Sequence, residues 1–442
     1  MHPKRGADKP HVVVLGAGFA GLTFCKRLTS GLARVTLLDR QNHHLFQPLL
    51  YQVATAGLAA PDIAQPVRSI LRDRRDVTVL MSDVTGVDLA RREVSHTGGV
   101  LGYDYLVIAL GGRTSYFGHE EWARHAPGLK SIDDALAIRR RVLSAFEDAE
   151  VEDDEARRGK LMTIVVVGGG PTGVEMAGAL AELSRTVLRR DFRRIDPAKA
   201  RVILVEGGPR VLGAFPANLS AKAERQLRRL GVEVRTGVAV REIHEDGLEL
   251  ASGERLAAAN VIWGAGVSAV PLAGTLGVPT DRAGRLRVEP DLSLPGWPSV
   301  FAAGDIVSLT DPSGRVVPGV SPAAMQMGRY IARTIAGELG TVTPPRRKPF
   351  CYFDKGTMAT IGRSAAVAKI GWAEFCGWPA WAAWLVVHIL FLIGFRNRIS
   401  VLLQWTYSYF TYRRGARLIT GLDPGRGDQG AAPAAGPGNR MT

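Results

Sequence analysis

The sequence predicts an α/β protein with two dinucleotide-binding domains and a helical C-terminal region. Two observations predict the domains: an apolar strand, a glycine-rich turn and a helix start follow one another at residues 12–21, and the pattern returns at residues 163–173. A third predicts the C-terminal region, because residues 377–395 carry no formal charge. At 442 residues with 46% hydrophobic content, the chain can form cores for two or three domains.

The first glycine turn follows Val12–Leu15, an apolar run typical of a buried parallel strand. Its candidate cofactor-binding residues are Gly16, Gly18, Phe19, Ala20 and Gly21. Gly16 permits the tight turn, Gly18 lets the backbone approach a pyrophosphate, and Gly21 brings helix and strand close. Asp39 ends the next strand, where an acid is placed to bind a ribose hydroxyl.

The second glycine turn follows Thr163–Val167 and has the same organisation. Its glycines are Gly168, Gly170 and Gly173. Glu206 ends the strand that comes next, in the position that the acid takes in the first unit. Two such units predict two dinucleotides, one retained as a flavin and one that exchanges as a nicotinamide.

Other segments complete the two sheets. Val77–Val87 is predicted as one strand, and Tyr103–Gly112 as a strand that ends in glycines where a backbone could approach a cofactor. Val261–Trp263 closes the second unit and is followed by Gly266. Ser299–Asp305 is predicted to return to the first domain and to put a carboxylate at a strand's carboxyl end, where open α/β sheets bind ligands.

The formal net charge of +14 comes from 56 Lys and Arg against 42 Asp and Glu. Nucleic acid, an anionic membrane surface or an arginine-rich solvated surface would each suit this charge. The basic clusters are scattered and no aromatic-interleaved nucleic-acid motif accompanies them. We therefore expect an anionic membrane surface and no nucleic acid as the partner.

The three cysteines, Cys25, Cys351 and Cys376, are far apart and form no CxxC or metal-ligand spacing. This usage predicts a reducing compartment and excludes a disulfide framework. His43 and His44 lack further ligands nearby, so no metal site is predicted. The first ten residues are basic without an apolar signal region, and secretion is not predicted.

The uncharged stretch Gly377–Phe395 would extend about 28 Å as a helix, near the length that spans a bilayer. Pro379 lies near its start and His388 inside it. Its tryptophans crowd one end, at Trp378, Trp381 and Trp384. A second predicted helix, Ile399–Tyr412, carries Trp405, Tyr409 and Tyr412 at helical spacing before Arg413, Arg414 and Arg417.

Aromatic side chains at headgroup level beside arginines are typical of helices that lie in the membrane interface. We therefore expect peripheral attachment through residues from about Trp378 to Arg417. A single spanning anchor and a buried homodimer interface are the alternatives for this apolar surface. The tail at 423–442 is rich in Gly, Pro and Ala and is predicted to be disordered.

These residues resemble the bacterial type II NADH:quinone oxidoreductases, which are single-subunit flavoproteins that do not pump protons. The resemblance covers roughly Val12 to Gly421. It rests on the segments GAGFAG, FQPLLYQVATAGL, GGGPTGVE, VFAAGD, PAAMQMGRYIA, YFDKGTMATIGR and the aromatic C-terminal stretch ending RRGARLI. It implies two Rossmann-like domains, arranged as in glutathione reductase, plus a membrane-associating helical region.

The resemblance also implies where the two dinucleotides bind. It assigns Gly16, Gly18, Gly21 and Asp39 to the ADP part of FAD, and Asp305 to its ribityl chain. It assigns Gly168, Gly170, Gly173 and Glu206 to NADH. A carboxylate at Glu206 would repel a 2′-phosphate and favour NADH over NADPH, although Arg210 follows four residues later.

Glu175, Gln326 and Lys355 are the candidate catalytic residues, because the resemblance places them near the isoalloxazine and the quinone entrance. Glu175 and Lys355 are expected to tune the flavin or relay protons near its ring. Two of these residues also have an explanation without a role in catalysis. An acid at Glu175 is favoured by the helix dipole, and Gln326 is equally well explained as an ordinary helix residue. Many family members have AQxAxQ where this chain has SPAAMQ, so Pro322 replaces the first glutamine. The helix itself is predicted to begin at Ser321-Pro322.

The expected activity is hydride transfer from NADH to FAD, followed by transfer of two electrons to a membrane quinone in the respiratory chain. The expected location is the cytoplasmic side of a bacterial inner membrane. The predicted domains are an FAD-binding domain at 1–115 and 276–345, an NADH-binding domain at 116–275, a membrane-binding domain at 346–422, and the tail at 423–442.

Two alternatives come from different classes of protein. A sulfide:quinone oxidoreductase shares the expected fold, but its chemistry needs at least two cysteines at the flavin. Here Cys351 is the candidate, while Cys25 lies in the first nucleotide helix and Cys376 beside the apolar stretch. The non-enzyme alternative is a basic flavoprotein that binds nucleic acid or a partner through its charge.

Overall fold

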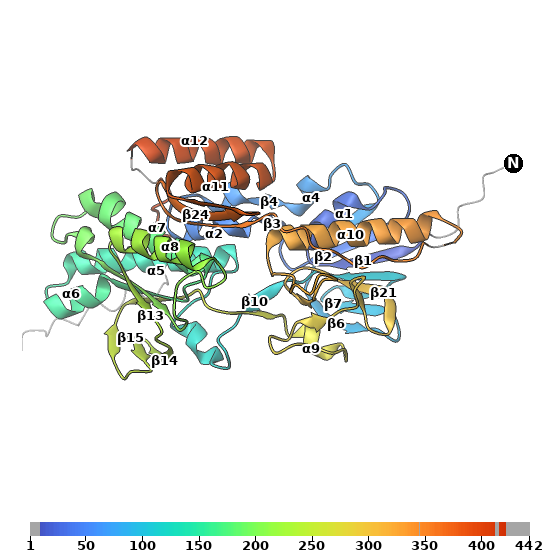
Figure 1. The fold of residues 1–442 in the computed structure, drawn as a ribbon, viewed down its shortest axis with the longest axis horizontal. Coiled ribbons are helices and arrows are strands. Elements are labelled where there is room, and N and C mark those ends of the chain that lie inside the picture. Colours follow the sequence, from blue (N-terminus) through green and yellow to red (C-terminus); the bar gives the residue numbers. More distant parts are fainter. Residues whose placement is uncertain (1–8, 344, 412–414, 421–442) are drawn as a thin grey trace, which may run out of the picture.

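The computed structural model describes residues 9–343, 345–411 and 415–420, and its chain forms two lobes (Figure 1). The sequence predictions for Tyr412, Arg413, Arg414 and the tail at 423–442 lie outside these residues. Helices of the C-terminal region lie across the top of one lobe, close to the point where the lobes meet (Figure 1).

The first lobe is built on a six-stranded sheet that contains the first glycine turn. In spatial order its strands are β20 (Ser293–Leu294), β21 (Trp297–Ala302), β9 (Tyr105–Ile108), β1 (His11–Leu15), β2 (Arg34–Asp39) and β5 (Val77–Met81). All neighbours pair in parallel except β20 with β21. The register aligns Leu15 with Leu38 and Ile108, so these strands end at one edge of the sheet.

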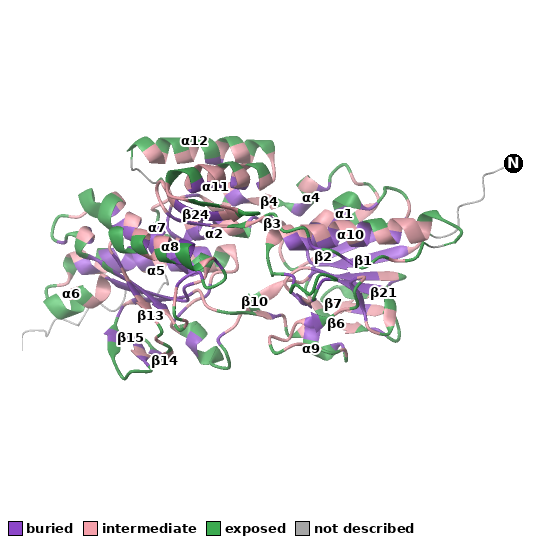
Figure 2. Ribbon diagram, viewed as in Figure 1, coloured by how far each residue is buried: buried purple, intermediate pink, exposed green. Residues whose placement is uncertain are grey.

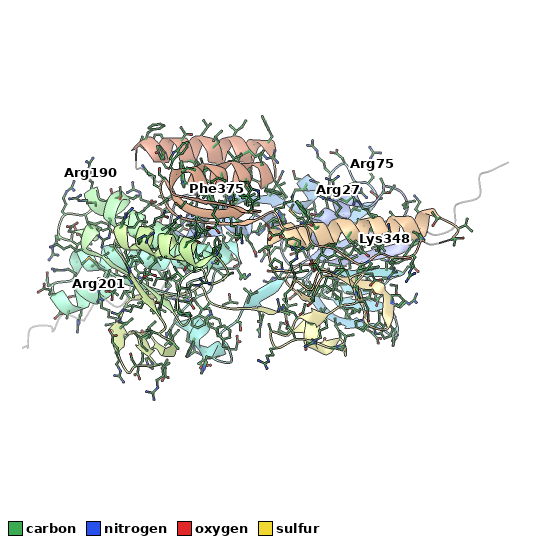
Figure 3. The ribbon with its side chains drawn as sticks, viewed as in Figure 1. Arg27, Arg75, Arg190, Arg201, Lys348 and Phe375 are labelled. Atoms are coloured by element: carbon green, nitrogen blue, oxygen red, sulfur yellow. The ribbon has the colours of Figure 1, made fainter. Side chains whose placement is uncertain are left out.

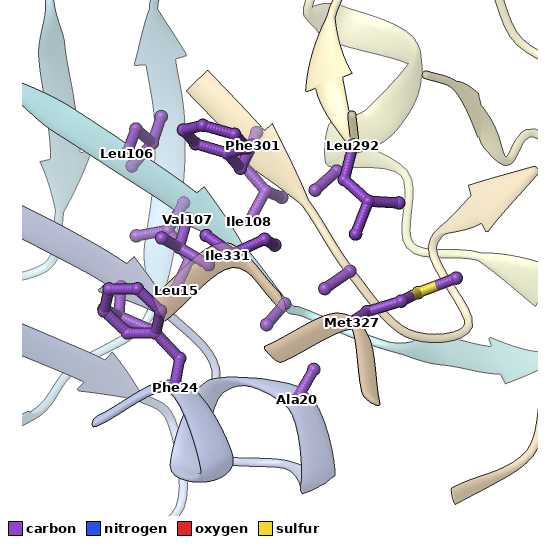
Figure 4. Packing of buried hydrophobic residues seen from close by; sticks show 14 of the residues in the cluster. Leu15, Ala20, Phe24, Leu106, Val107, Ile108, Leu292, Phe301, Met327 and Ile331 are labelled. Atoms are coloured by element: carbon purple, nitrogen blue, oxygen red, sulfur yellow. The ribbon is translucent and has the colours of Figure 1, made fainter. Parts of the chain in front are cut away.

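Two helices cover one face of this sheet, α1 (Phe19–Arg27) and α10 (Ser321–Gly340). They approach closely because Gly328 has no side chain: a Cβ there would lie 2.3 Å from the Ala20 carbonyl oxygen. Figure 4 shows the buried core around this contact, where Phe24 and Ile331 pack beside Leu15. The helix predicted from Ser321-Pro322 therefore packs directly against α1, the helix that follows the first glycine turn.

The second lobe is built on a four-stranded parallel sheet that contains the second glycine turn. Its strands are β13 (Val232–Thr236), β12 (Arg201–Glu206), β11 (Thr163–Val167) and β17 (Asn260–Trp263). The lobe's helices are α5 (Ile132–Val151), α6 (Glu155–Leu161), α7 (Pro171–Glu182) and α8 (Ala217–Arg229). Figure 2 shows that buried residues gather on both large sheets.

The lobes are connected by a two-stranded ribbon, in which β10 (Gly112–Thr114) pairs antiparallel with β18 (Val267–Ala269). Each lobe also carries a small antiparallel sheet. These are β6 (Val84–Asp88), β7 (Glu93–His96) and β8 (Gly99–Gly102) in the first, and β14 (Val240–His244), β15 (Gly247–Leu250) and β16 (Arg255–Ala257) in the second. The single strand predicted at Val77–Val87 was wrong, because Ser82 and Asp83 separate β5 from β6.

Several shorter strands and helices lie near the junction between the two lobes or at the edge of the first lobe. They are β3 (His43–Leu45), α2 (Leu50–Ala54), α3 (Ala60–Ile63), β4 (Ala64–Pro66), α4 (Val67–Ile70), α9 (Leu272–Thr275), β19 (Leu286–Arg287) and β22 (Val307–Ser308). The segment at 41–71, predicted as loop and short helices, has this mixed structure.

The C-terminal region combines a three-stranded antiparallel sheet with two helices. The elements are β23 (Thr357–Gly362), β24 (Ala365–Ile370), β25 (Ala373–Cys376), α11 (Trp378–Phe391) and α12 (Phe395–Thr411). The helix predicted over Gly377–Phe395 stops at Phe391, and the chain turns at Gly394, whose φ of 89° favours glycine. At 14 residues α11 is about 21 Å long, and none of the described helices has the length and apolarity to cross a membrane.

This region is attached to both lobes through α7, α2 and α3. Gly178 of α7 lies directly under β23, where a Cβ would meet the Ile361 carbonyl oxygen at 1.7 Å. Helix α12 is held to α3 by Asp62, which accepts hydrogen bonds from Ser400 Oγ and Gln404 Nε2 at 3.0 Å each. The sheet and helices therefore form one layer on the second lobe, close to its junction with the first (Figure 1).

Gly178→Ala should lower the melting temperature, because the added methyl group would force α7 and β23 apart at a backbone contact. Overpacking of this kind costs about 1–3 kcal/mol. Gly159→Ala in α6 is the matched control, since a Cβ there meets no atom within 4 Å and alanine favours a helix. Thermal unfolding of both variants checks this, and an unchanged melting temperature in Gly178→Ala would contradict the packing argument.

Candidate functional site

The first glycine turn has the geometry of a dinucleotide cradle. Gly16 has a φ of 99°, and a Cβ at Gly21 would lie 1.9 Å from the Gly16 carbonyl oxygen, so both positions require glycine. A Cβ at Gly18 would meet nothing within 4 Å, which leaves room for a ligand beside the backbone. Asp39 is held at the strand end by the Ala17 N–H, which donates to Oδ2 at 2.6 Å. Oxygen lone pairs remain for ribose hydroxyls.

Two residues beside this turn have definite packing roles. Phe19 begins α1 and makes edge contacts with the rings of His44 and Phe46, at 5.0 and 5.9 Å between centroids. Ala20 is the residue on which α10 packs. His44 is buried, and its Nδ1 bonds the Ala17 carbonyl oxygen at 2.9 Å, which fixes the loop behind the cradle.

The second glycine turn repeats this geometry. Gly168 has a φ of 106°, a Cβ at Gly173 would lie 1.8 Å from the Gly168 oxygen, and one at Gly170 would meet nothing. Glu206 accepts hydrogen bonds from the N–H groups of Gly169 and Gly208. The two glycine turns therefore share one geometry, and each leaves room for a ligand beside its middle glycine.

Arg210 lies four residues after Glu206, and its guanidinium donates a hydrogen bond of 3.0 Å to the Gly213 carbonyl oxygen. Asp305 lies at the carboxyl end of the first sheet next to Gly112, with 3.5 Å from a Cβ at Gly112 to the Asp305 Cβ. Its Oδ2 is 3.8 Å from the ammonium of Lys130. Lys130 was not predicted from the sequence, because no motif surrounds it. It lies just before the start of α5.

An inner cavity opens between the lobes at the end of β17. Its lining residues are Gln47, Pro48, Leu50, Tyr51, Thr114, Leu129, Lys130, Thr172, Glu175, Trp263, Gly264, Gly266 and Val267. Gly266 has a φ of 76°, and a Cβ there would clash with the Ser115 carbonyl oxygen at 2.9 Å. The cavity thus joins the predicted FAD edge to the mouth of the second nucleotide unit.

An outer cavity lies under the C-terminal helices. Its lining residues are Tyr51, Gln52, Thr55, Gly57, Glu175, Ala179, Glu182, Thr360, Ile361, Gly362, Arg363, Trp381, Trp384, Leu385, Trp405, Ser408 and Tyr409. Four of these aromatic residues were expected in the membrane interface: Trp381, Trp384, Trp405 and Tyr409. That expectation was wrong for Trp384, which is buried, while Trp381, Trp405 and Tyr409 are half-buried on the faces of α11 and α12 that line this cavity.

Glu175 and Tyr51 line both cavities and form the wall between them. Glu175 faces these openings, but protein atoms enclose it on its other sides, and this loss of hydration raises its pKa to about 8. The Thr360 N–H, 3.4 Å from Oε1, opposes the shift only partly. The Trp384 N–H also favours the charged form, although it does not reach hydrogen-bond geometry. Glu175 is therefore largely protonated at neutral pH.

Gln326 and Lys355 are not among the residues that line either cavity in the described chain. The Gln326 amide forms two hydrogen bonds of 2.9 Å with the backbone of Phe353, one to its oxygen and one from its N–H. The Lys355 ammonium lies over the ring of Phe391, 5.1 Å from its centroid. The structure thus brings Glu175 to the cavities and places the other two beside the loop at 353–355.

The cysteines lie in three separate environments, and all are free. Cys25 is buried in α1, and burial raises the pKa of its thiol to about 12. Cys351 is exposed and Cys376 is partly buried at the end of β25. Neither cavity is lined by a cysteine. This arrangement lacks the cysteine pair that polysulfur chemistry at a flavin requires.

Comparison with known protein families gives two matches. Residues 10–328 match the family described as pyridine nucleotide-disulphide oxidoreductase, and residues 355–414 match the NDH2 C-terminal domain. Among solved structures, NDH2 from Plasmodium falciparum, determined in complex with NADH, superposes with a TM-score of 0.86. It is 20% identical, and the match covers 93% of this chain and all of that one.

The sulfide:quinone oxidoreductase of Aquifex aeolicus also shares the fold, with a TM-score of 0.69 and 16% identity over 91% of this chain and 95% of that one. Two type II NADH:quinone oxidoreductases of Mycobacterium tuberculosis are much more similar in sequence. Ndh is 47% identical over 92% of this chain and 90% of its own length, and NdhA is 44% identical over 95% and 91%. The chain therefore belongs to the type II NADH:quinone oxidoreductase family.

Proposed function

We propose that the protein passes a hydride from NADH to bound FAD and then two electrons to a membrane quinone, without pumping protons. The observation that carries this proposal is the shared wall of Glu175 and Tyr51 between two cavities. One cavity opens at the nicotinamide-binding unit and the other lies among aromatic rings under the C-terminal helices. Family membership supports the same activity.

Bound FAD supplies the redox chemistry, because a flavin takes a hydride from a nicotinamide and gives two electrons to a quinone. The chain's residues bind and orient. Asp39 and the first glycine turn hold the ADP part of FAD, and Asp305 holds its ribityl chain near Gly112. Glu206 and the second glycine turn hold NADH so that its nicotinamide reaches the inner cavity past Gly266. The division into domains at 1–115, 116–275, 276–345 and 346–422 is part of this proposal.

Glu175 holds a proton at the wall that both cavities share. A quinone needs two protons when it accepts two electrons, and a neutral carboxyl group at this wall can donate one. The aromatic side chains of Trp381, Trp405 and Tyr409 suit a flat quinone ring on the other side. Gln326 and Lys355 act as positioning residues, through Phe353 and Phe391, for the loop at 353–355.

The outer faces of α11 and α12 form the docking surface for the membrane. Their large apolar residues are more than a third exposed at Trp378, Val386, Leu390, Phe395, Ile399, Leu402, Leu403, Tyr407 and Phe410. Figure 2 shows the exposed outer side of α12 at the top of the molecule. Figure 3 shows Arg75 and Arg190 on the upper edges of the two lobes, where they can meet anionic headgroups.

This surface attaches the protein peripherally to the cytoplasmic face of the inner membrane of a bacterial cell. Arg417, expected on the headgroups, instead forms an ion pair with Asp191 that ties the chain after α12 to the second lobe. A homodimer that covers the same apolar surface is the alternative, and the Leu403→Glu variant distinguishes it from membrane attachment.

Anaerobic mixing tests the function directly. Protein loaded with FAD should lose its flavin absorption when NADH is added and recover it when a quinone follows. Bleaching by NADH without recovery by any quinone would contradict the proposal. Bleaching by sulfide in place of NADH, followed by recovery with a quinone, would favour the sulfide:quinone oxidoreductase alternative. Salt-sensitive retention of DNA without quinone reduction would favour the binding-protein alternative.

Glu206→Gln should narrow the preference for NADH over NADPH, because it removes the charge that repels a 2′-phosphate. We expect kcat/KM for NADH to fall about tenfold, the equivalent of one charge-assisted hydrogen bond. Steady-state kinetics with both nucleotides check this, with the exposed Glu242→Gln in the same lobe as control. Equal efficiency of NADH and NADPH in the unsubstituted enzyme would refute the assignment.

Quinone-dependent flavin reoxidation should slow above about pH 8, where Glu175 loses the proton it donates. Glu175→Gln holds no transferable proton, so its reoxidation should be at least about tenfold slower and nearly independent of pH between 6 and 9. Stopped-flow traces measure this step, and flavin reduction by NADH in the same variant is the internal control. A pH profile in Glu175→Gln that matches the native one would exclude the role.

Leu403→Glu should weaken binding to anionic vesicles by about tenfold or more, because a charge replaces a side chain that the lipid surface would bury. Val100→Glu on β8 is the control, since Val100 is similarly exposed but lies in the small sheet of the first lobe. Vesicle co-sedimentation measures binding. Unchanged vesicle binding together with a dimer that dissociates in Leu403→Glu would establish the homodimer alternative.

A further inference from the structure

One ammonium group reaches the inner cavity from the second lobe. It belongs to Lys130, which lies just before α5 and lines this cavity at the junction of the lobes. Its side chain is 25% exposed, so it remains open to a bound molecule. Among the described residues that line the cavity, Lys130 is the only lysine or arginine. The positive charge on this wall is therefore concentrated at one point.

The backbone of Lys130 is fixed by the start of α5. Asp134 Oδ2 accepts a hydrogen bond from the Lys130 N–H at 3.0 Å and another from the Ser131 N–H at 2.8 Å. The Ser131 hydroxyl in turn accepts one from the Asp134 N–H at 3.1 Å, which completes a capping box. The base of the lysine side chain is therefore held in one place, and its stem points the ammonium across the junction.

On the other side of the junction the ammonium meets Asp305 of the first lobe. The Lys130 Nζ lies 3.8 Å from Asp305 Oδ2, which is close enough for an ion pair but too far for a hydrogen bond. A lysine carries three N–H donors. Within the described part of the chain those of Lys130 form no hydrogen bond, so they are available to a ligand that carries negative charge.

The position of Asp305 indicates which molecule meets this ammonium. In the proposed function Asp305 holds the ribityl chain of FAD, and the flavin ring is attached directly to that chain. A hydride that leaves NADH carries two electrons and one proton, so the ring that accepts it gains one negative charge. A cation beside the ring lowers the free energy of this charged form. Glu175, the only carboxyl group among the described lining residues, is largely neutral and does not cancel the effect.

We propose that the Lys130 ammonium binds the edge of the FAD ring on which this negative charge develops, and thereby raises the midpoint potential of the bound flavin. The inference rests on the proposed function and adds a cofactor-binding residue from the opposite lobe. Lys130 keeps its proton throughout, so the step needs no reactant beyond NADH and FAD. The lobe that binds NADH then also contributes to the binding of reduced FAD.

Lys130→Met removes the charge and keeps most of the length of the side chain. We expect the equilibrium constant for two-electron reduction of bound FAD to fall about tenfold, as for the loss of one charge-assisted hydrogen bond, which lowers the midpoint potential by about 30 mV. Lys130→Arg should restore most of this potential. Lys222→Met in α8 is the matched control, since Lys222 is also half-buried but lines neither cavity of the described chain. An anaerobic reductive titration against a reference dye measures the potential without turnover.

A second measurement uses the unsubstituted protein and does not depend on the folding of a variant. A reduced ring that keeps its negative charge takes up one proton per two electrons, so its midpoint potential falls by about 30 mV per pH unit. A ring that is neutralised takes up two protons and falls by about 59 mV per pH unit.

We expect the smaller slope for bound FAD between about pH 5.5 and 6.5, and a larger one for free FAD in the same buffer. Asp305 and Glu175 are the other ionisable side chains at this site. Burial raises the pKa of Glu175 to about 8, so this group stays protonated over the range and adds nothing to the slope.

The proposal is overturned if Lys130→Met keeps the native potential, if Lys222→Met lowers it equally, or if the unsubstituted protein has the steeper slope. An unchanged potential together with weaker binding of NADH would instead assign the ammonium to the nicotinamide nucleotide. Failure of the proposed function looks different, because the flavin potential would then depend on Lys130 while no quinone reoxidises the flavin.

Discussion

The contact between helix α7 and strand β23 at Gly178 determines how the parts of this molecule are placed. Helix α7 begins at the second glycine turn, so its N-terminus belongs to the nicotinamide-binding unit. Two turns later the helix meets the Ile361 carbonyl oxygen, at a distance that only glycine allows. One rigid helix therefore fixes the C-terminal sheet relative to the nucleotide site. Glu175 lies between these two contacts, and this position puts its carboxyl group on the wall of both cavities.

The same geometry explains the chemistry of Glu175. Its side chain sits where the second lobe, α2 and the C-terminal layer come together, so it loses water on most sides without gaining a cationic partner. Desolvation then dominates its titration, and the carboxyl group stays largely protonated at neutral pH. Had a lysine or arginine stood beside it, the carboxylate would be charged and would repel electron density on a quinone. Lys130 is at the inner cavity too, but its ammonium pairs with Asp305.

The nucleotide-binding parts were predictable because they are local. Gly16 and Asp39 in the first unit, and Gly168 and Glu206 in the second, lie within short segments whose spacing follows from one strand, one turn and one helix. The outer cavity was not predictable in this way. It brings Tyr51, Glu175 and Trp405 together from distant parts of the chain, and each takes part only through tertiary packing.

The aromatic residues of α11 and α12 show a second limit of sequence analysis. Helical spacing indicates that Trp405 and Tyr409 share a face, but it does not tell a lipid-facing stripe from one that faces a cavity. The chain turns near Gly394 and folds α12 back along α11, and this turn determines which face of each helix lies toward the cavity. Asp62 then fixes the rotation of α12 through its hydrogen bonds with Ser400 and Gln404. Resemblance to a family could indicate the membrane, but not which side chains face it.

Because α11 and α12 form a single layer, their two faces serve two different environments. The inner face supplies Trp384 and Trp405 to the outer cavity, and the outer face presents Leu402, Leu403 and Phe410. Arg363 closes this layer at one end, since its guanidinium donates to the Ser408 and Tyr409 carbonyl oxygens at the end of α12. In the proposed function, this single layer of helices lies between a quinone in the bilayer and the cavity wall that holds Glu175. A thicker cover would place a longer barrier between the membrane and that wall, so a thin helical layer suits the proposed use of a substrate that stays in the membrane by a peripherally attached enzyme.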